Sequence, residues 1–196
     1  MTFPDIAILR MRYLRGPNVW TYRPVIEAWV DLGALEDHPS HTLPGFVERL
    51  NAWLPGMVEH RCGVGERGGF LQRLNEGTWC GHIMEHVAIE LQTLAGMQVG
   101  FGKARETSQR GVYKVVIRTR QEEVGKESMT AARDLVMAAI NNTAFDLKAT
   151  VSRLKTMVDR LCLGPSTACI VDAATDHRIP SIRLTSGNLV QLGYGS

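Results

Sequence analysis

The feature that constrains this chain most is a run of apolar residues with helical spacing near its centre. The apolar positions follow one another at steps of three and four residues: Ile83, Val87, Leu91 and Leu94. Such spacing is typical of a helix that has one face in a hydrophobic core. Thr78 is a candidate N-cap and Gly96 a candidate C-terminal glycine, so we predict a central helix over residues 79–95.

The same predicted helix carries a His-x-x-Glu-His motif formed by His82, Glu85 and His86. Because residues four apart lie one turn above each other on a helix, the two imidazoles can hold one metal ion. This is the pattern of the inverted zinc peptidases, in which zinc activates water and a carboxylate accepts its proton. Glu85 would be that general base. The alternative is a helix face of ordinary solvated side chains.

One helix cannot complete such a site, because catalytic zinc usually has three protein ligands. Glu90 is a further turn along, roughly 12 Å from His82 at 1.5 Å per residue, so a third ligand must come from another segment. A structural zinc site made of Cys62, Cys80, His60 and His82 is a second possibility, although its spacing is unlike that of zinc fingers. The four cysteines contain no Cys-x-x-Cys pair, so we expect buried reduced thiols.

The composition is that of an ordinary globular protein, with 44% hydrophobic and 21% charged residues. A formal net charge of +2 over 196 residues is too small to indicate nucleic-acid binding. We find no apolar run of transmembrane length and no signal peptide at the N-terminus. We therefore expect a cytoplasmic protein with neither nucleic acid nor membrane as a partner.

The remaining patterns predict an α+β fold, in which helices pack on a small antiparallel sheet. Alternating and β-branched residues predict the strands, at residues 6–14, 25–32 and 111–119. Apolar residues with helical spacing predict the helices, at residues 43–54, 79–95 and 122–140. A further amphipathic helix over residues 147–161 would bridge to the C-terminal part. The glycine-rich residues 63–69 lack the Lys-Ser/Thr of a phosphate-binding loop and are expected to be flexible.

A domain boundary is expected near residues 163–167, where glycine, proline and two capping residues follow one another. A short helix to about residue 176 and a strand near residues 179–184 would follow. Because the chain closes with a βα-like fragment and a glycine-rich tail, we expect it to be a piece of a longer protein.

Nine short motifs, spread in order over almost the whole chain, together carry a family resemblance. They lie at residues 14–20, 43–46, 68–71, 76–79, 81–88, 99–102, 105–107, 163–167 and 190–195. In these motifs the chain resembles the N-terminal region of the cyanophycin synthetase family. That family uses ATP to build cyanophycin, a poly-aspartate backbone with an arginine attached to each side chain.

The resemblance implies a division of the chain into three parts. Residues 1–145 would form an N-terminal polymer-binding, metallopeptidase-like domain, residues 146–162 a helical linker, and residues 163–196 the truncated start of an ATP-grasp domain. This segment would lack the ligase active sites, so ATP and Mg²⁺ would act only in the full-length ligase. The full-length enzyme is expected to be a homo-oligomer.

The resemblance also implies a zinc-dependent site that cuts cyanophycin into primers for polymer synthesis. His82, Glu85 and His86 match the family's motif residue by residue. The third ligand would lie at the start of the helix that follows the strand at residues 111–119, where Glu122 is our choice. The rival positions are Glu123 and Glu127.

A polymer with alternating carboxylates and guanidinium groups needs a groove with charges of both signs. The candidate contacts are charged residues that we place in glycine-containing loops beside the central helix: Arg15, Arg67, Lys103, Arg105 and Glu106. The alternative for each is an ordinary solvated loop charge. For the whole segment, the alternatives are a non-catalytic domain that anchors the polymer and has no metal site, and an unrelated metal-binding regulator.

Overall fold

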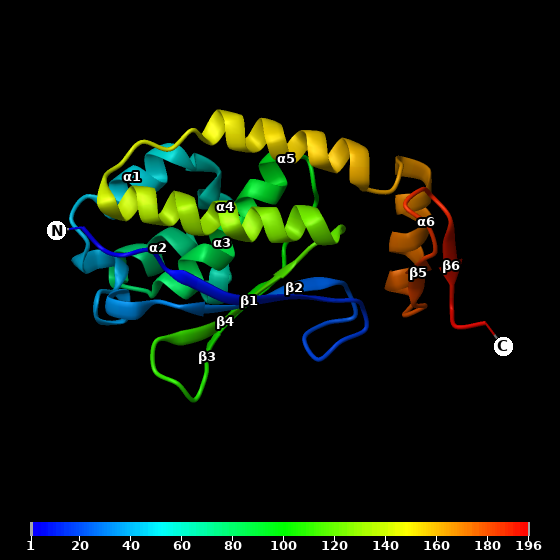
Figure 1. The fold of residues 1–196 in the computed structure, drawn as a ribbon, viewed down its shortest axis with the longest axis horizontal. Coiled ribbons are helices and arrows are strands. Elements are labelled where there is room, and N and C mark those ends of the chain that lie inside the picture. Colours follow the sequence, from blue (N-terminus) through cyan, green and yellow to red (C-terminus); the bar gives the residue numbers. More distant parts are fainter. Residues whose placement is uncertain (1, 196) are drawn as a thin grey trace.

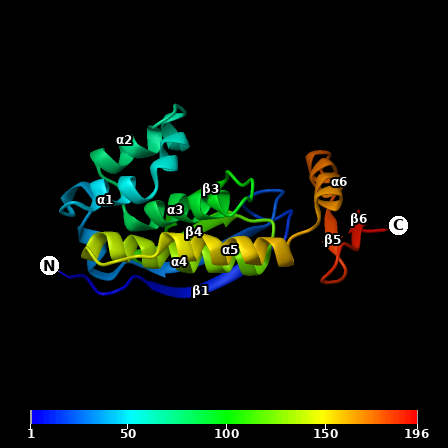
Figure 2. The same cartoon turned by 90° about the horizontal axis from the view of Figure 1, so that it is seen from above.

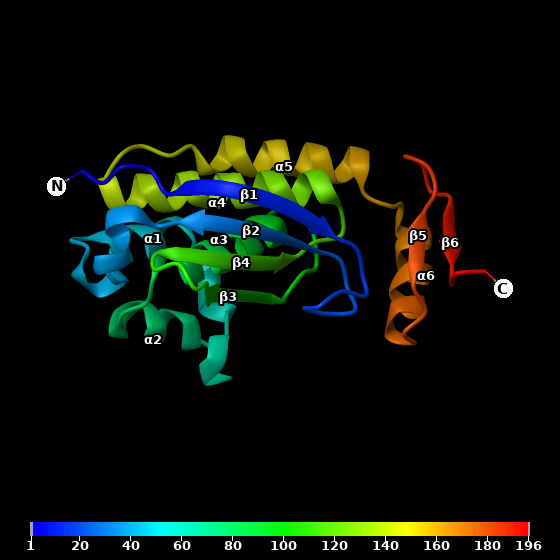
Figure 3. The same ribbon diagram turned by 60° about the horizontal axis from the view of Figure 1, so that its bottom comes forward.

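The structure, a computed structural model, describes residues 2–195 and is built on a four-stranded antiparallel sheet. In spatial order the strands are β1 (Ala7–Leu14), β2 (Val25–Asp31), β4 (Val112–Arg118) and β3 (Gly102–Glu106). The central strands β2 and β4 are rich in β-branched residues, which fit a pleated, half-buried surface. Figure 3 shows this order across the sheet.

Two long helices cover one face of the sheet. α3 (Cys80–Leu94) packs on β3 and β4, whereas α4 (Glu122–Asn141) packs on β1 and β2. α5 (Leu147–Leu161) forms an outer layer on α4, as Figures 1 and 2 show. No helix within residues 2–195 combines the length and the apolar character needed to cross a membrane.

Short helical elements connect the sheet to α3 and pack around it. They are the 3₁₀ turns η1 (Gly33–Asp37), η2 (Ser40–Thr42), η3 (Pro55–Glu59) and η4 (Cys62–Val64), and the helices α1 (Phe46–Trp53) and α2 (Gly69–Glu76). The largest apolar side chains of this layer, including Phe46, Leu50 and Phe70, are fully buried. This packing brings residues 60–70 against the side of α3 that the sheet does not cover.

The C-terminal part lies at one end of the molecule (Figure 1). It consists of α6 (Pro165–Asp176) and a two-stranded sheet of β5 (Ser181–Arg183) and β6 (Val190–Leu192). Asp172 of α6 forms ion pairs with Arg23 at 3.5 Å and with Arg120 at 2.7 Å. These ion pairs join α6 to the segments that follow β1 and β4.

The predicted α+β class and the small antiparallel sheet are confirmed. The structure adds β3, whose charged residues 103, 105 and 106 we expected in a loop. As an edge strand with exposed charges, β3 lacks the apolar run that marks a buried strand. The predicted cap of α3 is wrong, because Trp79 takes the N-cap position without a capping hydrogen bond. Thr78 instead contacts His82 through its hydroxyl group.

Candidate metal centre

α3 turns its histidines and glutamates into the protein and not toward solvent. Glu85 and His86 each keep 6% of their surface exposed, and His82 is half-buried. Phe70 of α2 stacks on the ring of His86, with 4.0 Å between the ring centroids, and meets the edge of His82 at 5.6 Å. The alternative of a solvated helix face does not fit this burial.

Three donor atoms from two segments meet at the start of α3. Sγ of Cys62 lies 3.3 Å from Nε2 of His82, and that nitrogen lies 3.1 Å from Nε2 of His86. All three donors lie within 4.8 Å of one another. Ligand atoms around a tetrahedral zinc ion are roughly 3.3–3.6 Å apart, so the geometry and the chemistry of this donor set fit one such ion.

Cys62 reaches this position from a strained turn. Its backbone φ of 50° lies in the left-handed region, which side chains other than glycine rarely adopt and which clusters at functional sites. Cys80, the other thiol of the proposed structural zinc site, is fully buried in the core. Burial raises the pKa of the Cys80 thiol to about 12, so it is unsuited to act as a thiolate ligand.

Burial keeps both histidines neutral. It lowers the pKa of His82 to about 4, with a further contribution from the positive charge of Arg73. It lowers the pKa of His86 to about 2, with contributions from His82 and His60. Because metals bind the neutral imidazole, both side chains are already in the ligating form at neutral pH.

Glu85 lies beside the donor set, with its Oε1 atom 4.0 Å from Nε2 of His86. Burial raises the pKa of Glu85 to about 8, although the charge of Arg105 acts in the opposite direction. The carboxyl group fits under β3 because residue 102 is glycine. A Cβ atom at Gly102 would lie 2.5 Å from Cγ and 2.6 Å from Oε1 of Glu85.

A cavity of about 480 Å³ opens onto the donor set, and both Cys62 and His82 line it. Ala104 of β3 and Tyr113 of β4 form its sheet side, and Arg73 of α2 also lines it. The candidate metal ligands are therefore partly covered by protein but open to a small peptide-sized group.

Glu122, the predicted third ligand, lies far from these histidines. α3 begins beside Tyr113, near the start of β4, whereas Glu122 follows the end of that strand, roughly 17 Å away at about 3.4 Å per residue. Its carboxylate accepts a hydrogen bond from Nζ of Lys126 at 2.6 Å. The rival positions are engaged in the same region, Glu123 near Lys126 at 3.9 Å and Glu127 with Arg153 at 2.6 Å. In the structure Cys62, not Glu122, joins the two histidines.

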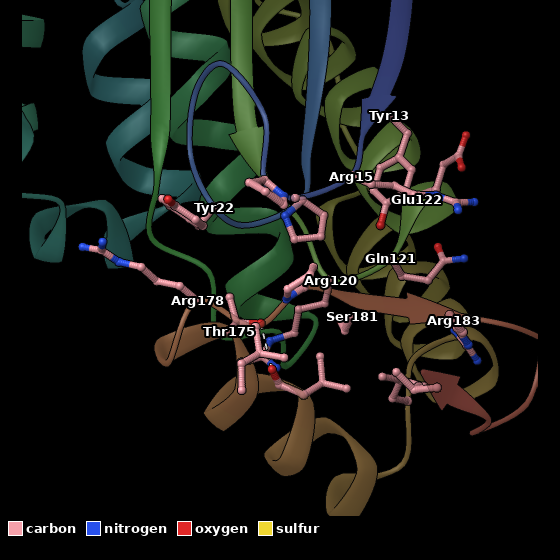
Figure 4. A pocket seen from close by; sticks show the side chains of 18 of the residues that line it. Tyr13, Arg15, Tyr22, Arg120, Gln121, Glu122, Thr175, Arg178, Ser181 and Arg183 are labelled. Carbon is pink, nitrogen blue, oxygen red and sulfur yellow. Dashed lines mark hydrogen bonds between the residues drawn. The ribbon is translucent and has the colours of Figure 1, made fainter. Parts of the chain in front are cut away.

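Arg15 and Glu122 both line a second cavity, of about 350 Å³. Figure 4 shows that it lies between the end of β1, the start of α4 and the C-terminal part, with Arg120, Arg178 and Arg183 around it. This cavity is separate from the donor set. Arg15 is therefore not beside the candidate metal centre.

Of the other predicted polymer contacts, Arg67 forms an exposed ion pair with Glu59 at 2.7 Å. Lys103 and Arg105 lie on the outer face of the sheet, because β3 alternates and its Gly102 and Ala104 face α3 and the cavity. Glu106 pairs with Tyr113 at the end of β3.

The outer face of the sheet carries a row of basic residues around one indole. Arg10, Trp29, Lys114 and Arg105 are successive cross-strand neighbours on β1, β2, β4 and β3. The guanidinium of Arg10 and the ammonium of Lys114 lie 4.5 Å and 4.7 Å from the centre of the Trp29 ring, within reach of a cation–π interaction. Lys103 lies on the same face of β3.

Sequence reasoning gave several residues around the donor set a different role or none. Cys62 was predicted only as a ligand of a possible Cys₂His₂ structural zinc site. The close spacing of His60 and Cys62 was the one local signal for that role. His60 contacts His86, Glu90 contacts His60, and the Thr78 hydroxyl contacts His82. These contacts join residues from separate segments, which a local pattern does not reveal.

Comparison with known proteins agrees with the motif resemblance. Residues 27–141 match the family model described as the cyanophycin synthase-like N-terminal domain. The chain is 44% identical over 196 residues to the cyanophycin synthetase of Geminocystis herdmanii, and 44% identical over 195 residues to those of Trichormus variabilis and a Synechocystis species. Each match covers 97% of this chain and 22% of the relative, so the chain spans about a fifth of their length. The chain therefore belongs to the cyanophycin synthase-like N-terminal domain family.

Proposed function

We propose that this chain is the N-terminal part of a cyanophycin synthetase and that its metal centre cuts cyanophycin into primers. The observation that carries the proposal is the meeting of Cys62, His82 and His86 within 4.8 Å beside a cavity, with Glu85 next to them. One thiolate and two imidazoles are a donor set that zinc accepts, with a fourth position left for water.

A zinc ion bound there would activate a water molecule and polarise the peptide carbonyl. Glu85 would accept a proton from that water and deliver it to the leaving amine. Burial raises the pKa of this carboxyl group to about 8 in the metal-free protein. The charge of a bound zinc ion would lower that pKa toward neutral pH, where a group can both accept and release a proton efficiently. Gly102 leaves the space in which this carboxyl group lies.

One side chain in the wall of the cavity suits the carboxylates of the polymer. Arg73 lines the cavity and can bind a carboxylate of the polymer.

The proposal extends to the longer protein of which this chain would be a part. Residues 1–145 would be the polymer-binding domain, residues 146–162 the linker and residues 163–196 the start of an ATP-grasp domain. Ligation of aspartate and arginine with ATP and Mg²⁺ would take place in the longer protein. We place that protein in the cytoplasm as a homo-oligomer.

The test compares the wild-type chain with the variants His82→Ala/His86→Ala and Glu85→Gln. Elemental analysis should find about one zinc per wild-type chain and per Glu85→Gln chain, and none in the double histidine variant. After incubation with cyanophycin, only the wild type should shorten the polymer. Cutting by a zinc-loaded Glu85→Gln variant would remove Glu85 from its role, and cutting by the metal-free double variant would refute the metal centre.

A second candidate function, anchoring of the polymer without hydrolysis, is favoured by the outer face of the sheet. Arg10, Lys114 and Arg105 lie in one row across the four strands, with Trp29 between Arg10 and Lys114, and carboxylates of the polymer could bind along this row. This function needs no metal. A metal-free chain that binds cyanophycin and leaves its length unchanged would favour it over the first proposal.

A further inference from the structure

A chain of hydrogen bonds runs from the metal donors to a buried carboxylate on the same helix. Nδ1 of His86 lies 2.8 Å from Nδ1 of His60, and Nε2 of His60 lies 3.0 Å from Oε2 of Glu90. The side chains of His60 and Glu90 are only 11% and 7% exposed. The hydrolytic proposal assigns no role to either residue.

With Glu90 ionised and His60 neutral, the chemistry of these groups gives the chain of hydrogen bonds one direction. An ionised carboxylate only accepts hydrogen bonds, so Nε2 of His60 must donate to Glu90. Nδ1 of a neutral His60 is then an acceptor, and Nδ1 of His86 must donate to it. The proton of His86 is thereby placed on Nδ1, and the lone pair on Nε2, the atom that faces His82.

The outer nitrogen of His82 also has a hydrogen-bonding partner. Its Nδ1 lies 2.8 Å from the hydroxyl oxygen of Thr78, a residue that is only 3% exposed. The outer nitrogen of each imidazole is thus engaged, and the two inner nitrogens face each other at 3.1 Å, next to the thiol of Cys62. Without a metal ion, Nε2 of His82 can donate a hydrogen bond to the lone pair of His86. With a cation between the two nitrogens, both lone pairs would bind it, and the Thr78 hydroxyl would accept the proton of Nδ1 of His82.

The packing around Glu90 shows that the carboxylate fits closely in its place. A Cβ atom at Gly56 would lie 2.1 Å from Oε1 of Glu90, so the glycine of η3 makes room for it. At the other end of this chain of hydrogen bonds, Phe70 stacks on His86 with an interplanar angle of 25°. The rings and the carboxylate are therefore held from both sides.

We propose that His60 and Glu90 are positioning residues of the metal centre, which hold His86 with Nε2 free to bind a divalent cation. This inference rests on the metal site of the proposed function. A carboxylate can orient a histidine ligand by accepting a hydrogen bond from the ring nitrogen that does not bind the metal. Removing such a carboxylate typically lowers metal affinity by about 10–100-fold. Here the orientation passes through a second imidazole.

The experiment uses Co²⁺ as the probe and the whole 196-residue chain. Glu90→Met keeps the length of the side chain but removes the acceptor, whereas Glu90→Gln keeps an acceptor and removes the charge. Glu59→Met is the matched control, because Glu59 is adjacent to His60 but exposed. Co²⁺ affinity is measured by competition with a chelator, and absorption spectra report the ligands. Far-UV circular dichroism confirms that each variant is folded.

We expect Glu90→Met to weaken Co²⁺ binding by about 10–100-fold, Glu90→Gln to weaken it less, and Glu59→Met to leave it unchanged. The thiolate-to-cobalt band from Cys62 should persist in Glu90→Met while the ligand-field bands change, because only His86 loses its orientation. If Glu90→Met does not fold, the isosteric Glu90→Gln must still show weaker binding. Wild-type affinity in both folded Glu90 variants would overturn this inference alone, whereas a wild-type chain that binds no Co²⁺ would overturn the metal centre as well.

Discussion

Sγ of Cys62 lies 3.3 Å from Nε2 of His82, although the two residues are 20 positions apart in the chain. Cys62 reaches this position because η3 and η4 fold back against α3 and because its own backbone adopts a left-handed conformation. A helix with a His-x-x-Glu-His motif thereby gains a third donor from a loop. The ligand type matters, because a thiolate favours zinc and similar soft or borderline ions.

Replacing Cys62 tests this third donor directly. Cys62→Ser should reduce zinc affinity by at least about tenfold, because a hydroxyl group is a poor ligand for zinc compared with a thiolate. Zinc retained after dialysis against a chelator measures the effect. Cys169→Ser is the control, since Cys169 is an exposed free thiol, and equal zinc retention in both variants would remove Cys62 from the ligand set.

The variant Cys62→Gly separates the effect of losing the thiolate ligand from the effect of the backbone conformation at residue 62. Glycine adopts the left-handed conformation without strain, so this variant should fold at least as well as Cys62→Ser. It should nevertheless lose zinc to the same extent. Thermal unfolding of the metal-free proteins, together with zinc retention, distinguishes the two effects.

Gly102→Ala should displace the carboxyl group of Glu85, because the new Cβ atom would lie 2.5 Å from Cγ of that side chain. We expect about the same zinc content as in the wild type but a loss of polymer cutting of tenfold or more, in the range of a lost general base. Gly100→Ala is the matched control, since a Cβ atom there meets nothing within 4 Å. Unchanged cutting by Gly102→Ala would show that the position of Glu85 does not matter for the reaction.

The buried carboxyl group of Glu85 predicts a pH dependence of stability in the metal-free protein. Burial raises its pKa from 4.5 to about 8, so the folded state binds the proton more tightly than the unfolded state. Below the pKa of the unfolded state, the carboxyl group is protonated in both states and does not change the free energy of unfolding. As the pH rises from about 4.5 to about 8, ionisation increasingly opposes folding, and the penalty then stays constant.

Glu85→Gln cannot ionise, so its stability relative to the wild type should increase over this pH range by on the order of a few kcal/mol. Urea unfolding of both proteins at about pH 5 and about pH 8 measures the change. The titration of His82 and His86 largely cancels in this comparison, because both proteins contain them. A stability difference that is the same at both pH values would contradict the raised pKa.

The basic row on the outer face of the sheet predicts where the polymer binds. Arg10→Gln/Arg105→Gln should weaken cyanophycin binding by roughly threefold to thirtyfold, as expected for the loss of two exposed ion pairs, and should reduce its dependence on salt. Arg67→Gln is the control, because Arg67 already pairs with Glu59. Binding to immobilised polymer at two salt concentrations is the measurement, and equal loss in the control would argue against a specific surface.

The residues by themselves determined the central helix, most of the sheet and the His-x-x-Glu-His motif. Apolar spacing and strand alternation are local properties, and they are visible in a short window of sequence. The family motifs, which are also local, led to the same family that the comparisons identify. We did not predict β3, because an exposed edge strand has few apolar residues in a regular pattern.

The tertiary structure alone decided which side chains meet. Glu122 follows the predicted strand as expected, but the length of β4 carries it away from His82, and Cys62 takes the place beside the histidines. The hydrogen bonds of His60 with His86 and Glu90 likewise join the turn before Cys62 to the middle of α3. Such meetings require donor atoms from separate segments to come within about 4 Å, and this depends on how η3, η4 and α2 pack against α3, which no local spacing encodes.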